Sequence, residues 1–232
     1  MAQAHRHKFG DIEAAIIPGK EKGPAVILLH GYGADMTDLM PLADYMNVSR
    51  DVTWIFPNGP MNVVIGPGFS GRSWYEIDMS RIEKAMISGE HVDLSDKRPP
   101  GLDRARDQVS SLYEEVRKNH SKVILGGFSQ GAMLSVELTL TQKVKPEGLI
   151  IFSGVLMDQE NWKRNAQTAA SVPFIQSHGR NDAILGFSGA EKLYCVLTDA
   201  GLYGEFIEFS GGHEIPPKVL EKTSDFLKAQ LR

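Results

Sequence analysis

Cysteine, long apolar runs and clusters of basic residues are all scarce in this sequence. Its 232 residues include one cysteine, so an intrachain disulfide is excluded and a reducing compartment fits the chain. The longest apolar runs, such as residues 25–29, are far too short to span a bilayer, so no integral membrane segment is expected. The net charge is −4 and no Lys/Arg cluster occurs, which argues against nucleic acid as a partner.

The lone cysteine and the amino-terminal histidines are expected to have no catalytic role. Cys195 lies among apolar neighbours in a helix-like stretch, which favours a buried structural thiol over a nucleophile. The amino terminus is basic, but no apolar segment follows it, so it does not resemble a secretory signal. We therefore expect His5 and His7 in a solvated, frayed end, and the protein in the cytoplasm.

Short apolar or β-branched runs alternate with longer helical patterns along the chain. Continuous apolar runs bounded by Gly or Pro are typical of strands buried on both faces of a parallel sheet. The pattern predicts an α/β fold, with a mostly parallel central sheet and helices on both faces, and the length fits one domain, residues 1–232. The expected strands are residues 12–17, 25–30, 52–56, 122–126, 148–152, 173–178 and 205–209, and the expected helices are 35–45, 102–119, 130–141, 189–200 and 217–231.

Residues 60–100 interrupt this alternation. They hold four of the twelve prolines and show no clear strand, but Phe69, Trp74, Tyr75 and Ile77 are too apolar for a disordered segment. Long irregular connections in compact domains are usually functional. We expect a folded, irregular excursion that starts at the C-terminal edge of the sheet, near the active site.

The strongest chemical signal is a G-x-S-x-G motif at residues 127–131, where an apolar strand runs directly into a helix. Such a turn is so sharp that side chains two residues before and after the serine would collide, so both positions are glycine. The turn presents Ser129 at a helix N-terminus, where backbone N–H groups can stabilise an oxyanion. Ser129 is therefore the predicted nucleophile.

Two near-copies of this motif fail the same test. The stretches around Ser70 and Ser188 lack glycine at the fifth position, and no strand precedes Ser188. Ser188 is instead expected to be the N-cap of the following helix, with Glu191 completing a capping box.

The general base is predicted from the order of residues along the chain. In this class of fold the acid and then the histidine follow the serine, each on a loop after a strand. Only His178 and His213 come after Ser129. His213 lies on a Gly-rich loop before the last helix and is the predicted base, whereas His178 ends a strand too early and is expected to be structural.

The orienting acid is predicted to be Asp182, which follows the strand 173–178 and a glycine turn. Asp158, on the loop after the preceding strand, is the alternative position, and Asp199 lies within a helical pattern. Glu214 is adjacent to His213 and is expected to be a solvated loop acid.

Two backbone amides are expected to form the oxyanion hole. One is the amide of Gln130, the residue after the nucleophile. The other is the amide of Tyr32, on the His-Gly-Tyr-Gly loop at residues 30–33 that follows an early strand. His30 itself is expected to fix this loop by hydrogen bonding.

With these motifs in view, the sequence resembles the phospholipase/carboxylesterase family of α/β-hydrolases, which includes bacterial carboxylesterases and acyl-protein thioesterases. The resemblance spans roughly residues 25–227 and rests on the segments 29–33, 56–58, 73–75, 127–131, 178–182 and 212–213. It implies ester or thioester hydrolysis through an acyl-enzyme without a cofactor or metal. Candidate substrates are short- to medium-chain acyl esters, lysophospholipids and S-acylated proteins, and the sequence is compatible with a homodimer.

Departures from the family pattern concern the substrate pocket. Tyr32 stands where relatives often carry leucine, and the Trp74-Tyr75-Glu76 segment only loosely matches the family's Trp-Phe-Asp loop beside the active site. Trp74, Tyr75 and Phe69 are the expected substrate-binding residues. Two alternatives remain: a non-catalytic ligand-binding protein of the same fold, and a lysophospholipase or peptidase with the same catalytic residues.

Overall fold

The computed structural model, which describes residues 3–46 and 48–232, is built on an eight-stranded sheet. The strand order is β1-β2-β4-β3-β7-β8-β9-β10, and the neighbours from β4 to β10 are parallel to one another. The strands β1 and β2 are antiparallel to their neighbours. The strands are β1 His5–Phe9, β2 Ile12–Ile17, β3 Ala25–Leu29, β4 Thr53–Pro57, β7 Val123–Phe128, β8 Gly148–Phe152, β9 Pro173–Gly179 and β10 Tyr203–Phe209.

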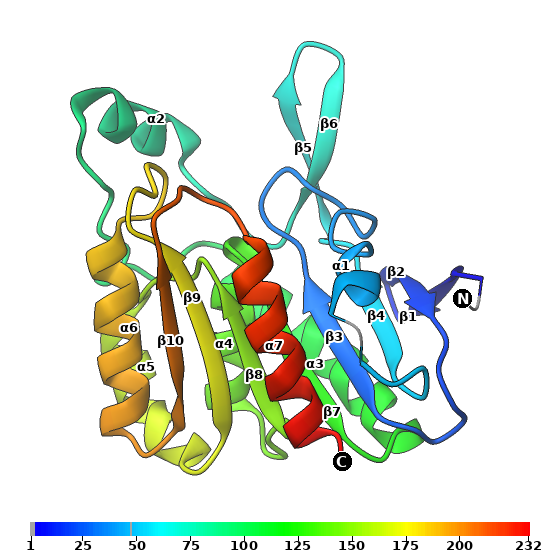
Figure 1. The fold of residues 1–232 in the computed structure, drawn as a ribbon. Coiled ribbons are helices and arrows are strands. Elements are labelled where there is room, and N and C mark those ends of the chain that lie inside the picture. The colour runs from blue at the N-terminus through cyan, green and yellow to red at the C-terminus, as the bar shows by residue number, and fades with distance from the viewer. Residues whose placement is uncertain (1–2, 47) are drawn as a thin grey trace.

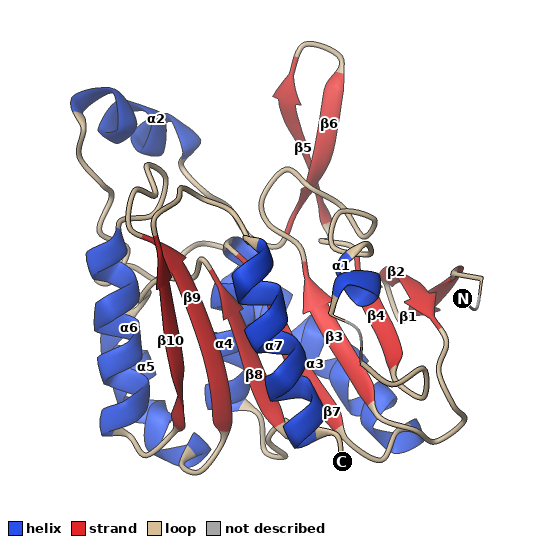
Figure 2. Cartoon of the chain, viewed as in Figure 1, coloured by secondary structure: helices blue, strands red, loops and turns tan. Residues whose placement is uncertain are grey.

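Helices cover both faces of this sheet, as the sequence pattern predicts (Figure 1; Figure 2). One face of the sheet packs against α3 to α6, and the opposite face packs against α7 and the residues around α1. The central strands are buried along their whole length, which explains their continuous apolar sequences. The helices are α1 Leu42–Tyr45, α2 Met79–Ser88, α3 Leu102–Asn119, α4 Gln130–Thr141, α5 Gln159–Ala166, α6 Phe187–Asp199 and α7 Pro217–Gln230.

The prediction of a helix at residues 35–45 is wrong for most of this range, because only Leu42–Tyr45 is helical. The Asp35 carboxylate accepts hydrogen bonds from the backbone N–H and the hydroxyl of Thr37 at 2.7 and 2.6 Å. A side chain that satisfies backbone groups locally stabilises a turn in place of a helix. The amide of Met36 donates to the Asn58 side chain at 2.9 Å, which fixes the turn on the end of β4.

The amino-terminal segment is also more ordered than predicted. His5 and His7 belong to β1, an edge strand paired with β2 from His5↔Ile16 to Phe9↔Ile12, so the expectation of a frayed end is wrong for these residues. Residues 1 and 2 of that expected end lie outside the described residues. Four of the five β1 side chains are exposed, which is why the strand carries no apolar signal.

Residues 60–100 are likewise more regular than predicted. They contain a hairpin, β5 Met61–Gly66 and β6 Phe69–Ser73, and the helix α2, and Figure 1 shows both projecting beyond the C-terminal edge of the sheet. Asp78 caps α2 by accepting from the Arg81 amide, and Gly89 ends it in a left-handed conformation with φ 72°. Most side chains of the hairpin are exposed or only partly buried, so its strands carry no continuous apolar run that the sequence pattern could reveal.

Cys195 is exposed, so its expected burial is wrong. Helix α6 turns Ala190, Leu193, Val196 and Leu197 toward the core. Cys195 falls between these positions, on the side that faces solvent.

Candidate active site

Ser129 lies at the turn between β7 and α4, in a strained backbone conformation with φ 53° and ψ −115°. A Cβ atom on Gly127 would lie 2.6 Å from the carbonyl oxygen of Leu29, and one on Gly131 would lie 2.1 Å from the same oxygen. No side chain fits at either position, because β3 passes directly beneath the turn. The sequence therefore encodes the sharp turn through these two glycines.

His213 and Asp182 are brought together by the loops after β10 and β9. His213 Nδ1 donates to Asp182 Oδ2 at 2.6 Å. The other oxygen, Oδ1, accepts from the amides of Ile184 and Leu185, both at 2.9 Å. Burial by itself raises the pKa of Asp182, but the hydrogen bonds from His178, His213 and Leu185 outweigh it and hold the pKa well below its usual range.

His178 lies behind Asp182 and supports it. Its Nε2 donates to the carbonyl of Leu185 at 2.8 Å and lies 3.3 Å from Asp182 Oδ2. The ring is fully buried, and its Nδ1 has no partner among the described residues. His178 and His213 thus both approach the same carboxylate oxygen of Asp182.

The other candidate residues lie elsewhere. Asp158 is paired with Arg98 at 2.6 Å and accepts from Asn161, and Asp199 is the last residue of α6. Glu214 is exposed, and its carboxylate accepts from the Gly212 amide at 3.3 Å.

Ser188 lies within α6 and not at its N-cap, which is Gly186 without a side-chain cap. The predicted capping box is therefore wrong, because the helix begins two residues earlier than the pattern indicates.

Hydrogen bonds of the His30 and Trp74 side chains fix the loop at residues 30–33. His30 Nδ1 donates to the carbonyl of Gly31 at 2.7 Å, and its Nε2 accepts from the amide of Gly59 at 2.9 Å. Trp74 Nε1 donates to the carbonyl of His30 at 2.9 Å. Burial lowers the pKa of His30 to about 4, so the ring is neutral and fixed in the Nδ1–H tautomer.

Gln130, the first residue of α4, connects this helix to residues 73–75. Its side-chain oxygen accepts from the amide of Trp74 at 3.0 Å, and its side-chain nitrogen donates to the carbonyl of Tyr75 at 2.8 Å. Among the described residues, the backbone N–H groups of Gln130 and Tyr32 have no acceptor. They are the two amides that the sequence assigns to an oxyanion hole.

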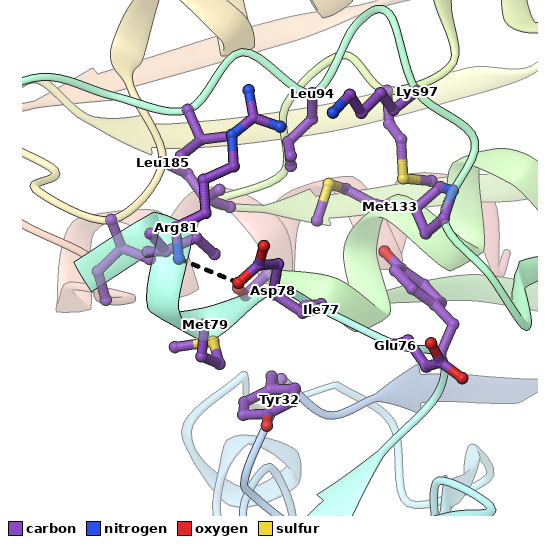
Figure 3. A pocket seen from close by; sticks show the side chains of 18 of the residues that line it. Tyr32, Glu76, Ile77, Asp78, Met79, Arg81, Leu94, Lys97, Met133 and Leu185 are labelled. Carbon is purple, nitrogen blue, oxygen red and sulfur yellow. Dashed lines mark hydrogen bonds between the residues drawn. The ribbon is translucent and has the colours of Figure 1, made fainter. Parts of the chain in front are cut away.

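A cavity of about 340 Å³ opens beside Ser129 and His213. Figure 3 shows side chains that line it, from the loop at residues 30–33, the start of α2 and the segment before α3. Most of the lining is apolar, which suits an acyl chain. The apolar lining residues are Tyr75, Ile77, Met79, Ile82, Val92, Leu94, Pro99, Pro100, Phe128, Met133, Met157, Ile184 and Leu185.

Of the three expected substrate-binding residues, only Tyr75 lines this cavity. Trp74 is 1% exposed and packs against His30 of the loop at residues 30–33, with ring centroids 5.1 Å apart. Phe69 is 71% exposed on the projecting hairpin. Phe69 and Trp74 are absent from the lining because the chain direction at residues 69–74 turns the first outward and the second inward.

Sequence reasoning missed Met133, Met157, Ile184 and Leu185 as cavity residues. Met133 lies one turn after Ser129 on α4, and Leu185 lies three residues after Asp182. Their closeness in sequence to catalytic candidates is a usable signal, but an apolar residue in such a place is equally typical of the core.

A strained serine between a parallel strand and a helix, with a histidine–carboxylate pair on later loops, defines a serine hydrolase of the α/β-hydrolase fold. The profile of the Phospholipase/Carboxylesterase family matches residues 11–231. The chain therefore belongs to the phospholipase/carboxylesterase family and is an enzyme that hydrolyses carboxylic esters.

Similar proteins carry related names. The acyl-protein thioesterase 1 of Aspergillus fumigatus is 31% identical, and the match covers 92% of this chain and 90% of the relative. The crystal structure of esterase PE8 is 25% identical with a TM-score of 0.76 and covers 93% of this chain and 97% of its own. The crystal structure of Arabidopsis thaliana SOBER1 is 22% identical in sequence and superposes with a TM-score of 0.72. The match covers 90% of this chain and 99% of the SOBER1 chain.

The described part of the chain contains no helix that is both long and apolar enough to traverse a membrane.

Proposed function

We propose that Ser129, His213 and Asp182 form the catalytic triad of an esterase or thioesterase that works through an acyl-enzyme. The observation that carries the proposal is the 2.6 Å hydrogen bond from His213 Nδ1 to Asp182 Oδ2, made beside the cavity that Ser129 also lines. A base held in one tautomer and a serine on a strained turn, both lining one cavity, form the arrangement that acyl transfer needs.

In the first half-reaction, Ser129 Oγ attacks the acyl carbon while His213 Nε2 takes the hydroxyl proton. The amides of Tyr32 and Gln130 stabilise the oxyanion of the tetrahedral intermediate. When the intermediate collapses, the bond to the leaving group breaks, and His213 gives its proton to the departing alcohol or thiol. The acyl group is then bound to Ser129.

In the second half-reaction, water replaces the leaving group. His213 removes a proton from the water, the hydroxide attacks the acyl-enzyme, and the same amides stabilise the second intermediate. Collapse releases the carboxylic acid and returns the proton to Ser129. Asp182 stays ionised throughout and stabilises the imidazolium, for which its lowered pKa is suited.

We propose short- to medium-chain acyl esters and thioesters as substrates. The cavity of about 340 Å³ lies near the lower end of the usual range for ligand pockets, which is about 300–1,000 Å³. A cavity of this size accommodates a modest acyl chain, and the two oxyanion amides serve an ester and a thioester equally.

The test is a panel of p-nitrophenyl esters from acetate to decanoate, with an acyl-thioester and a peptide substrate beside it. We expect ester and thioester turnover with an optimum among short to medium chains, and a loss of several orders of magnitude in Ser129→Ala. Ser188→Ala is the matched control and should behave as the wild type. Turnover of the peptide alone, or full activity in Ser129→Ala, would overturn the proposal.

A further inference from the structure

One wall of the acyl cavity is formed by residues 92–100, which connect α2 to α3. Leu94, Lys97, Arg98 and Pro99 of this segment line the cavity, and Figure 3 shows Leu94 and Lys97 in it. Hydrogen bonds connect the segment to the body of the protein at both ends and along its length. At its start, His91 Nε2 donates to the carbonyl of Asp182 at 2.8 Å, and at its end the Glu76 amide donates to the carbonyl of Pro100 at 3.1 Å.

Between these ends, the side chain of Arg98 provides the strongest connection. Its guanidinium contacts three carboxylates: Asp158 at 2.6 Å through Nη1, and Glu137 at 2.8 Å and Asp103 at 2.6 Å through Nη2. The side chain of Glu137 is 2% exposed and that of Asp158 is 9% exposed, so each needs a cation beside it. Arg98 contacts both, and Arg106 also reaches Glu137. Charge-assisted hydrogen bonds of this kind are about twice as strong as neutral ones.

The two buried carboxylates belong to neighbouring elements that also contribute residues to the cavity lining. Glu137 lies on α4, one turn after the cavity residue Met133, and Asp158 directly follows the cavity residue Met157. Backbone hydrogen bonds from Asp158 to Leu94 and from Gln159 to Ser95 join the same two segments. Arg98, together with these two hydrogen bonds, therefore fixes the position of residues 92–100 relative to the neighbouring part of the lining.

We propose that Arg98 is a positioning residue that sets the length of acyl chain which the cavity accepts. This inference rests on the proposed esterase function. Arg98 holds residues 92–100 against α4 and the loop after β8, and the end of the acyl chain meets a wall whose place depends on this contact. Loosening the contact lets the wall move outward and admits longer chains.

Arg106 offers a matched control for this effect. It contacts two of the same carboxylates, Asp103 at 2.6 Å and Glu137 at 3.5 Å. It lies on α3, however, and is not among the residues that line the cavity. A substitution at Arg106 perturbs the same charge cluster without releasing the wall segment.

The experiment compares Arg98→Lys with Arg106→Lys over the p-nitrophenyl ester series. Lysine keeps the charge that the buried carboxylates need but cannot hold three of them in a planar fork. In Arg98→Lys we expect the optimum to move to longer esters, with kcat/KM relative to the hexanoate rising about fourfold for each additional methylene that becomes buried. The change should appear in KM more than in kcat, and Arg106→Lys should keep the wild-type profile.

A profile of Arg98→Lys parallel to the wild type, or one shifted to shorter chains, would overturn the inference. So would an equal shift in Arg106→Lys, because the effect would then belong to the whole charge cluster. If Arg98→Lys does not fold, Asp158→Asn, which removes one of the three anchors, is measured in its place with the same expected direction. Failure of the wild type to turn over any ester would instead refute the proposed function.

Discussion

Replacing Asp182 by asparagine is the most informative single change in the triad, because the two oxygens of this carboxylate have different partners. Oδ1 accepts from the amides of Ile184 and Leu185, whereas Oδ2 accepts from His213 at 2.6 Å and faces His178 at 3.3 Å. An asparagine keeps its oxygen toward the two amides, because the reverse orientation would oppose N–H groups. Its NH₂ group then faces His213.

The consequence for His213 is a change of tautomer. With a donor opposite it, Nδ1 must accept, so the proton moves to Nε2 and the ring can no longer take the proton of Ser129. In a serine protease triad, the same aspartate-to-asparagine change leaves the geometry intact but lowers kcat by about 10⁴. We expect a loss of the same order in Asp182→Asn, which corresponds to about 5.5 kcal/mol of transition-state stabilisation.

The assay is steady-state hydrolysis of p-nitrophenyl acetate, together with circular dichroism to show that the variant is folded. Asp158→Asn and Asp199→Asn are the controls, and both should retain kcat within about tenfold of the wild type. A crippled Asp158→Asn beside an active Asp182→Asn would refute this reasoning, since the orienting acid would then lie on the loop after β8.

Three further results are expected. Burial lowers the pKa of His30 to about 4. Between about pH 6.5 and pH 4, His30 therefore binds a proton in the unfolded chain but not in the folded chain. The free energy of unfolding consequently falls as the pH falls through this interval. The free energy of unfolding, measured by urea denaturation, should fall by about 2 kcal/mol between pH 7 and pH 5. This decrease should be absent in His30→Asn. Trp74→Phe removes the donor to the His30 carbonyl and should lower kcat/KM about three- to tenfold for every acyl length, whereas a changed length profile would place Trp74 in the acyl site. EDTA should leave ester hydrolysis unchanged, because the proposed mechanism uses no metal; inactivation reversed by a divalent ion would contradict it.

The sheet and its helices are predictable because the central strands are buried on both faces and their sequences are continuously apolar. Strand β1 is not, because four of its five side chains are exposed and nothing in its composition distinguishes it from a solvated end. The helix expected at residues 35–45 is mostly absent because a single side chain, Asp35, stabilises a turn. Local hydrogen bonds of this kind do not appear in hydrophobic periodicity.

The residues of the candidate site also fall into two groups, those that the sequence predicts and those that it does not. Ser129, Asp182 and His213 are marked by glycines and by their order after successive strands, and the structure brings Asp182 and His213 into hydrogen-bond contact. The pocket is harder to predict, because its lining depends on which way each side chain faces. Trp74 and Tyr75 are adjacent and equally buried, yet only Tyr75 reaches the cavity.

The role of Arg98 has no signal in the sequence at all. Its partners Asp103, Glu137 and Asp158 lie on separate elements, and the fold alone brings them together.

The central claim is that Ser129 is the nucleophile, and covalent labelling tests it most directly. The folded wild-type protein is treated with a fluorophosphonate, its intact mass is measured, and the modified peptide is mapped. We expect one adduct per chain on Ser129, none in Ser129→Ala, and slower labelling in Asp182→Asn. An adduct on Ser188, or labelling that persists in Ser129→Ala, would contradict the claim.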